Sequence, residues 1–388
     1  MSPYVNPVNS HDQAVENKKV NVALTPLPAP YITGMKLQAD IALGDLILNT
    51  IDANNVIWVC TDVKGWWTPP DPDIPQLSRG LGDGDYDVRG RWQARQIELS
   101  GSILPPSPSY SSVARDTLIR ACSLVYTGAW LKTNENPPRA SYVRLSGKPN
   151  IETVNARGRI DFSIGLRAPD PVKYKWNESD PDGYESVTIP SKSTSPVHAG
   201  AGTVNNVGNT PVTAIFDITG PLTGPATIQN TTTDELILVI DSLRAGVNAT
   251  VISKALTSNV ATITTLTSHG LSIDDEVTIA GVDSTFNGIY TVTGTPASNT
   301  FTYDKVASNV ASAGSGGTVV RDPDHLEIDT YDHSVAFNGL TYGARSKIDT
   351  LVDWIKLNPG NNSISFVDEG NANSTASLTV YYRSGWIG

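Results

Sequence analysis

The segment GRIDFSIGLRAPDP (residues 158–171) decides the fold class of the first half of the chain. Ile160, Phe162, Ile164 and Leu166 alternate there with polar or small residues, and a proline follows. Successive side chains of a strand point to opposite sides, so this alternation predicts a strand with one buried face. Proline then ends the strand because it cannot donate a backbone hydrogen bond to a neighbour.

Two nearby segments, RQIELSGSI (95–103) and SYVRLSG (141–147), alternate in the same way and extend the predicted sheet. The segment from Tyr110 to Val125 instead follows a helical period, and the proline-serine run before it can supply an N-cap. The apolar positions at helical spacing are Ala114, Leu118, Ala121, Cys122 and Val125. We therefore predict an α+β domain in which one helix packs on a sheet.

A second β pattern follows in ELILVIDS (235–242), HLEIDT (325–330) and SVAFNGL (334–340), the last with an Asn-Gly hairpin turn. The first two read as neighbours in one hairpin, although a threonine-rich segment with its own strand signals separates them. Loop tips accept whole domains when the ends of the insert lie close together, so we predict a small β domain inserted there. The residues from Thr341 onward read as two further strands that complete an antiparallel sandwich.

These patterns predict a mainly β protein in four parts. The parts are a flexible arm (1–30), an N-terminal α+β domain (31–176), a discontinuous β-sandwich (177–246 plus 323–388) and an inserted all-β domain (247–322).

The formal charge of −11 argues against a nucleic-acid-binding surface, since phosphate contacts need clustered lysine and arginine. Cys60 and Cys122 lie in apolar surroundings and are expected to be buried free thiols, in keeping with synthesis in a reducing cytoplasm. The first twenty residues have no apolar core typical of a signal peptide, and no apolar run is long enough to predict membrane insertion.

Motifs that carry chemistry are scarce, and we assign no catalytic residue, metal ligand or cofactor site. His325 and His333 could approach each other across a hairpin beside Asp324 or Asp332, but turn histidines next to aspartate are commonplace. Paired carboxylates for hydrolysis are defined by their separation in space, so a hydrolase stays open as the weaker alternative.

The stretch from Gly65 to Gly90 is rich in aspartate, and Asp83, Asp85 and Asp87 stand at alternate positions as in a calcium-binding EF-hand loop. The sixth position of that motif should be glycine and is Val88, and the twelfth should be glutamate and is Ala94. Gly80, Gly82 and Gly84 favour a tight loop instead.

Two adjacent tryptophans, Trp66 and Trp67, precede Pro69 and Pro70 in this stretch. Tryptophans in loops anchor a partner or pack on prolines of their own chain. We favour packing within an assembly over a platform for sugar binding.

Several motifs occur in the order found in one known family. DVKGWWTPPD, SRGLGDGDYDV, ARQIELSGSI, a helix and GRIDFSIGLRAPDPVKY together resemble the N-terminal domain of distal tail proteins of siphovirus-type bacteriophages, closest to those infecting actinobacteria. The motifs NTPVTAIFDITGPLTGPATIQN and YYRSGWIG are similar to the galectin-like C-terminal domain of the same family. The inserted segment resembles small β modules of phage tail and adhesion proteins.

The resemblance implies a structural protein at the distal end of a phage tail, made in the host cytoplasm. Its N-terminal domains would form a homohexameric ring that joins the tail tube protein to tail-tip, tail-associated and other minor tail proteins. Genome DNA would pass through the lumen without specific binding, and the net negative charge would repel its phosphates. The candidate ring-contact and ordering loop comprises Trp66, Trp67, Pro69, Pro70, Gly84, Asp85, Tyr86 and Asp87.

Two other functions remain open from the sequence. The inserted domain could bind a host cell-surface glycan, or the protein could be a hydrolase of the cell envelope. The galectin-like domain lacks a galectin-type constellation of His, Asn, Arg and Trp in HSVAFNGLTYGARSKIDTLVDW (333–354), so sugar binding there is not expected.

Overall fold

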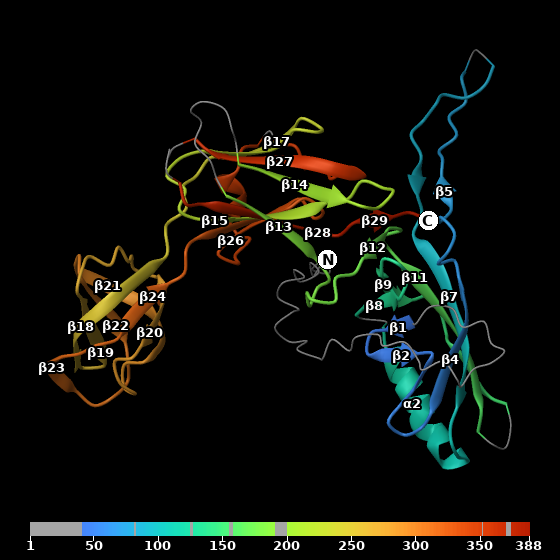
Figure 1. Cartoon of the computed structure of the whole chain (residues 1–388), viewed down its shortest axis with the longest axis horizontal. Coiled ribbons are helices and arrows are strands. Elements are labelled where there is room, and N and C mark those ends of the chain that lie inside the picture. The colour runs from blue at the N-terminus through green and yellow to red at the C-terminus, as the bar shows by residue number, and fades with distance from the viewer. Residues whose placement is uncertain are drawn as a thin grey trace.

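The structure is a computed structural model that describes residues 41–80, 83–124, 127–154, 158–190, 200–350, 352–369 and 374–388. The predicted arm (1–30) lies outside the described residues. The predicted fold class is confirmed, because the described part of the chain is mainly β with a single α-helix (Figure 1).

The first sheet, here called the N-terminal sheet, has eleven strands within the described residues. They are β1 (Ile41–Leu43), β2 (Leu46–Leu48), β3 (Thr50–Ile51), β4 (Ile57–Lys64), β7 (Arg95–Leu104), β8 (Ala129–Thr133), β9 (Arg139–Leu145), β10 (Asn150–Thr153), β11 (Ile160–Ala168), β12 (Lys173–Lys175) and β29 (Gly385–Trp386). Strand β11 is antiparallel to β7 from the pair Ile160 and Ile103 to the pair Ala168 and Arg95. The alternation in residues 158–171 therefore does bury one face, and Ile164 is fully buried.

The predicted helix is α2 (Ser111–Ala121), which follows the short 3-10 turn η1 (Pro108–Tyr110). Ala114 and Leu118 are buried in the same hydrophobic core as the sheet, as predicted. The predicted serine N-cap is wrong, because Tyr110 occupies the cap position and makes no side-chain capping hydrogen bond. The 3-10 turn runs directly into the helix and leaves no extended capping residue before it. The predicted end of the helix at Val125 lies outside the described residues.

The second half of the chain forms a sandwich of two antiparallel sheets. One contains β13 (Glu185–Pro190), β28 (Ser377–Tyr382), β15 (Ala214–Thr219), β25 (His325–Asp329) and β26 (Ser334–Phe337), and the other contains β14 (Gly200–Asn206), β27 (Gly360–Asp368), β16 (Ala226–Asn230) and β17 (Glu235–Val239). Phe216 from the first sheet and Phe366 from the second are fully buried in one shared core. A 3-10 turn, η2 (Ala344–Lys347), follows β26.

The predicted hairpin between residues 235–242 and 325–330 is wrong. Strand β17 lies in one sheet of the sandwich, whereas β25 lies in the other and pairs with β15 and β26. The two C-terminal strands β27 and β28 are likewise in opposite sheets. Apolar periodicity shows which face of a strand is buried, but not which of two packed sheets contains the strand.

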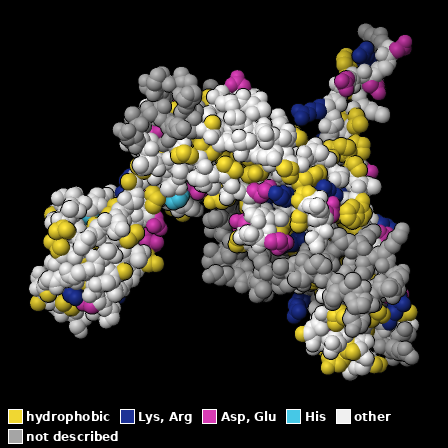
Figure 2. All heavy atoms as spheres, viewed as in Figure 1, with side chains coloured by type: hydrophobic (Ala, Val, Ile, Leu, Met, Phe, Trp, Pro, Cys, Tyr) yellow, Lys and Arg dark blue, Asp and Glu magenta, His cyan; other side chains and the backbone are white. Residues whose placement is uncertain are grey.

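The segment between β17 and β25 forms a closed barrel, which we define as residues 247–321. Its strands are β18 (Val247–Thr257), β19 (Val260–Thr265), β20 (Glu276–Ala280), β21 (Gly288–Ala297), β22 (Thr300–Asp304), β23 (Val310–Gly314) and β24 (Thr318–Arg321). Strand β18 pairs with both β19 and β24 and so closes the sheet on itself. Phe286, Phe301 and Tyr303 are fully buried inside, and the barrel stands apart from the sandwich as a separate lobe (Figures 1 and 2).

A network of charged side chains, in which Asp275, Arg321 and Asp324 are buried, lies where the barrel joins the sandwich. The Arg244 side chain donates to both carboxylate oxygens of Asp275 at 2.5 and 3.1 Å, and its backbone N–H donates to Asp324 at 2.8 Å. Arg321 donates to Asp324 at 2.9 Å. Arg244 and Arg321 flank the two ends of the barrel, so the network joins both connecting segments to one point.

Candidate subunit-contact site

The Gly65–Pro70 loop follows β4, and its first tryptophan is part of the core. Trp66 is fully buried, and its indole N–H donates to the Glu135 carboxylate at 2.6 Å. Gly65 has φ of +76°, and a Cβ added there would lie 1.9 Å from the Gln96 carbonyl oxygen. Only glycine fits this position, which fixes the chain direction into the loop.

Two buried cations hold the inner side of the loop. The Arg95 guanidinium is fully buried and donates to the carbonyl oxygens of Gly65 and Thr68 at 2.9 and 2.6 Å. The Lys173 ammonium donates to the Trp66 carbonyl oxygen at 3.1 Å. Burial lowers the pKa of Arg95 to about 10 and that of Lys173 to about 8.

The outer side of the loop faces solvent. Trp67 is 46% exposed and Pro69 is exposed, whereas Pro70 is buried. The two tryptophans therefore have different roles: Trp66 packs in the core of the N-terminal sheet, and Trp67 is accessible to a partner.

Beyond the loop, the chain forms a projecting ribbon, which we call the contact arm (residues 71–93). At its base β5 (Pro72–Asp73) pairs with β6 (Arg91–Trp92), and farther along Ser78 forms a bridge with Asp85 (Figure 1). Gly84 adopts φ of +82°, and its carbonyl accepts a hydrogen bond from the Arg79 N–H.

The predicted contact residues therefore lie in two separate places, the loop before the contact arm and the far part of the arm. Trp66, Trp67, Pro69 and Pro70 lie before the base of the arm, and Gly84, Asp85, Tyr86 and Asp87 lie toward its far part. In the described residues no three His, Cys, Asp or Glu side chains gather in a metal-binding arrangement.

Large apolar side chains are exposed along the arm. Ile74 is 63%, Leu77 57%, Tyr86 56% and Trp92 45% exposed, and the Arg79 guanidinium lies over the Tyr86 ring. Figure 2 shows hydrophobic side chains gathered where the arm leaves the body of the molecule. Ile74 and Leu77 are not among the predicted contact residues, although they are apolar residues in an otherwise polar, turn-rich stretch.

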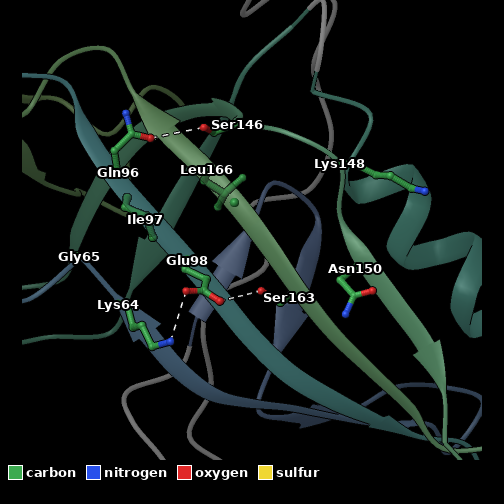
Figure 3. A pocket seen from close by; sticks show the side chains of 11 residues that line it. Lys64, Gly65, Gln96, Ile97, Glu98, Ser146, Lys148, Asn150, Ser163 and Leu166 are labelled. Atoms are coloured by element: carbon green, nitrogen blue, oxygen red, sulfur yellow. Dashed lines mark hydrogen bonds and ion pairs between the residues drawn. The ribbon is translucent and has the colours of Figure 1, made fainter.

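A shallow polar groove lies on the outer face of β4, β7 and β11 (Figure 3). The Glu98 carboxylate accepts from Ser163 at 2.9 Å and from Lys64 at 3.3 Å. These hydrogen bonds lower the pKa of Glu98, which keeps it ionised near neutral pH. An ionised, paired carboxylate is a poor general acid, so the groove offers no support for hydrolysis.

The two histidines considered as a metal pair do not approach each other. His325 begins β25 and lies 3.4 Å from Asp217, whereas His333 precedes β26 and stacks on the Trp354 ring. The hairpin pairs Asp329 with Ser334 and Leu326 with Phe337, which puts the two histidines at opposite ends.

Both cysteines are free and buried, as predicted. Burial raises the pKa of Cys60 to about 12 and that of Cys122 to about 11. Neither thiol is therefore a reactive thiolate at neutral pH.

A family model assigns the class of this protein. Residues 316–386, which include the last barrel strand β24, the sandwich strands β25 to β28 and β29, match SPP1_Dit, the C-terminal domain of siphovirus-type tail components. The fold and this domain define a structural protein of a siphovirus-type phage tail. This match over residues 316–386 indicates that the protein is a component of the tail of the virion.

Solved structures with similar chains come from phage tails. The SPP1 Dit protein, described as a paradigm of the hub adsorption apparatus in phages infecting Gram-positive bacteria, is 12% identical, with 84% of this chain and 93% of that chain covered and a TM-score of 0.41. Chains of the phage p2 baseplate in its activated conformation with calcium and with strontium are 8% and 9% identical, cover 89% of this chain and 97% of theirs, and give TM-scores of 0.34 and 0.31. Scores this low carry no assignment by themselves.

No curated protein matches the chain. Among the described residues, no helix combines the length and apolar character needed to cross a bilayer.

Proposed function

We propose that this tail component is the hub of the tail tip. Six copies would close into a ring through their N-terminal sheets and join the tail tube to the tail-tip and receptor-binding proteins. The genome would leave through the central channel. The family of the C-terminal domain supports a place in the tail, and the contact arm supports assembly.

The exposed apolar residues of the contact arm are the observation that carries this proposal. A cyclic ring needs two different surfaces on each copy, because every copy meets its two neighbours through opposite sides. A projecting ribbon with Leu77, Tyr86 and Trp92 exposed supplies one such surface without further folding. Stable interfaces bury at least roughly 1,000 Å² in total, which a ribbon lying along a neighbour can provide.

Ring assembly can be tested with the double variant Leu77→Ser and Tyr86→Ser. We expect the wild-type protein to give ring-shaped particles with a central hole in negative-stain micrographs, and the variant to remain monomeric in mass photometry. Val306→Ser in the barrel is the matched control, because Val306 is 87% exposed and lies far along the chain from the arm. If the double variant forms the same rings as wild type, the arm is not the contact surface.

A second function, which we also propose, is binding to the host surface through the barrel. The barrel has its own core and exposes Leu266, Ile273 and Ile289 on its outside. We further propose that the protein carries no enzymatic activity. The Glu98 carboxylate in the polar groove is paired with Lys64 and accepts a hydrogen bond from Ser163, which supports this.

A further inference from the structure

One short segment connects the sandwich, the N-terminal sheet and the Gly65–Pro70 loop, which we call the contact loop. We call residues 383–388 the strap. Its strand β29 leaves the sandwich and pairs with β12, so that Trp386 lies opposite Lys173 and Gly385 opposite Tyr174. All residues after Thr341 were expected in the sandwich, and Gly385 and Trp386 correct that expectation because they pair with the N-terminal sheet.

The strap is held by the sandwich on one side. The side-chain oxygen of Asn206 accepts from the Gly385 N–H at 3.2 Å, and that of Asn209 accepts from the Ile387 N–H at 2.9 Å. The Gly385 carbonyl accepts from the Asn209 N–H at 2.9 Å. Asn206 is fully buried, so its position is fixed by the sandwich core.

On its other side the strap is held by Arg95. One guanidinium nitrogen of Arg95 donates to the Ile387 carbonyl at 2.6 Å and to the Pro171 carbonyl at 3.0 Å. The other terminal nitrogen donates to the Gly65, Trp66 and Thr68 carbonyls. A single buried cation thus joins the loop to the strap, and a Cβ added to Gly388 would lie 3.4 Å from Pro69.

This arrangement, which we call the Arg95 clasp, has a consequence for assembly. A buried guanidinium must keep its acceptors, because each unmet donor costs free energy. Removal of the strap takes the Ile387 carbonyl away from Arg95 and exposes the inner side of the loop. Arg95 then lacks one of the acceptors that fix its position, so it holds the loop and the base of the arm less firmly.

We propose that the Arg95 clasp is a coupling device in which the docked sandwich orders the Trp66–Pro70 loop and the base of the contact arm. A copy offers its contact surface only when its strap is in place between the sandwich and the N-terminal sheet. The proposal rests on the proposed ring function for its biological use, but the coupling itself is a property of one chain.

Hydrogen exchange measured by mass spectrometry tests the coupling. We compare wild type with Arg95→Met and with a chain lacking residues 385–388, at dilution where copies are separate. The peptide covering 65–72 and the Gln93 amide, which donates to the Asp71 carbonyl, should exchange at least about tenfold faster in both variants. Peptides from β11 in the N-terminal sheet, from β16 in the sandwich and from the barrel should keep their wild-type rates, which shows that the variants remain folded.

The matched control is Arg345→Met. Arg345 also donates to backbone carbonyls, those of Ile348 and Asp349, but in the sandwich far from the loop. This variant should leave exchange of the loop unchanged. Loop exchange within twofold of wild type in the strap deletion would overturn the proposal.

Native-state exchange of the wild-type protein in low urea covers the case in which a variant fails to fold. The Gln93 and Ile387 amides should open with the same urea dependence and within about threefold of the same rate, as one cooperative unit. A loop that opens far more readily than the strap contradicts the coupling. These readouts do not depend on oligomer formation, so their failure leaves the ring proposal standing, and a monomeric wild type leaves the clasp standing.

Discussion

Lys173 occupies an unusual place for a lysine, because its ammonium is buried against two tryptophan rings. It lies 5.0 Å from the Trp66 ring centroid and 5.8 Å from that of Trp67, and it donates to a backbone carbonyl rather than to a carboxylate. Glu135 favours its charged form, but burial is the larger effect and lowers the pKa to about 8. The contact loop therefore rests on a cation that can lose its charge at mildly alkaline pH.

The stability of the protein should report this deprotonation. Between the folded pKa of about 8 and the ordinary lysine value, the unfolded chain holds a proton that the folded chain has released. Stability then rises with pH, because the unfolded state binds more protons. From pH 8 to 9.5 we expect the unfolding free energy of wild type to increase by roughly 1–2 kcal/mol relative to that of Lys173→Met.

Urea unfolding at several pH values measures this difference, and groups common to both proteins cancel in it. Parallel profiles for the two proteins would mean that Lys173 keeps its proton over the whole range.

At this scale the sequence predicted part of the candidate site. Trp66 and Trp67 are recognisable because aromatic residues beside prolines in a loop must either pack or bind. Arg95, Glu135 and Lys173 were not recognisable as their partners, because the hydrogen bonds join residues far apart in the chain, up to 292 positions for Arg95 and Ile387. Buried charge that satisfies backbone carbonyls leaves no local pattern.

Among the elements, the long strands of the N-terminal sheet were the most predictable and the sandwich connections the least. The alternation in β11 and β7 fixed their buried faces because one side of that sheet covers the core. Strand β17 looked like a partner of β25, yet the two lie in opposite sheets, because pairing depends on how the chain crosses between sheets. The segment predicted as an insertion therefore connects strands of two opposite sheets, β17 and β25, rather than two strands of one hairpin.

Ion pairs hold the junction between the barrel and the sandwich. The carboxylates of Asp275 and Asp324 are buried, while the Arg244 side chain remains 43% exposed. The hydrogen bond from Arg244 to Asp275 raises the pKa of Arg244. Both connecting segments therefore stay charged and paired near neutral pH, which favours a fixed angle between barrel and sandwich.

Replacing Arg244 with alanine should allow the barrel to change its orientation relative to the sandwich. The buried Asp275 carboxylate would lose its strongest donor, at a cost of roughly 1–3 kcal/mol in the unfolding free energy. Small-angle X-ray scattering should show a broader distribution of interatomic distances than for wild type.

The control is Lys64→Ala, which breaks the pair with Glu98. Both side chains of that pair are well exposed, at 64% and 45%, so the unfolding free energy and the scattering should both stay close to those of wild type. A wild-type scattering curve for Arg244→Ala would show that covalent connection and packing alone hold the barrel.

In the whole molecule the charge is divided unevenly. Residues 41–176 carry sixteen Lys and Arg against fourteen Asp and Glu, a formal charge of +2, whereas residues 177–388 carry nine against twenty-two, a formal charge of −13. The net negative charge of the chain therefore does not come from the part proposed to surround the genome. The expectation of an electronegative lumen loses its support, and the acidic surface belongs to the sandwich and barrel.

The two proposed functions, ring assembly and host binding, are assigned to different parts of the chain and can be separated by deleting the barrel. A chain in which Gly246 is joined directly to Asp322 lacks the barrel but keeps the contact arm and the clasp. We expect it to form the same particles as wild type in negative stain. Phage carrying it should adsorb to host cells at a rate reduced by at least about tenfold, because the projecting surface is gone.

Unchanged adsorption would reject host binding by the barrel and leave it a stabilising or spacing element. Failure of the shortened chain to assemble would instead mean that the barrel contributes to the ring.

The pairing of Val247 with Arg321 means that the chain leaves and rejoins the sandwich at neighbouring positions, about 5 Å apart as in any antiparallel pair. Any foreign module whose own termini meet at that spacing could be spliced into this site without stretching the host fold. The pairing of β18 with β19 closes the barrel, β23 pairs with β18 outside that closure, and in the described residues the barrel's sheet contains no strand of the sandwich. The junction at Val247 and Arg321 is therefore a position at which a different binding domain could be inserted.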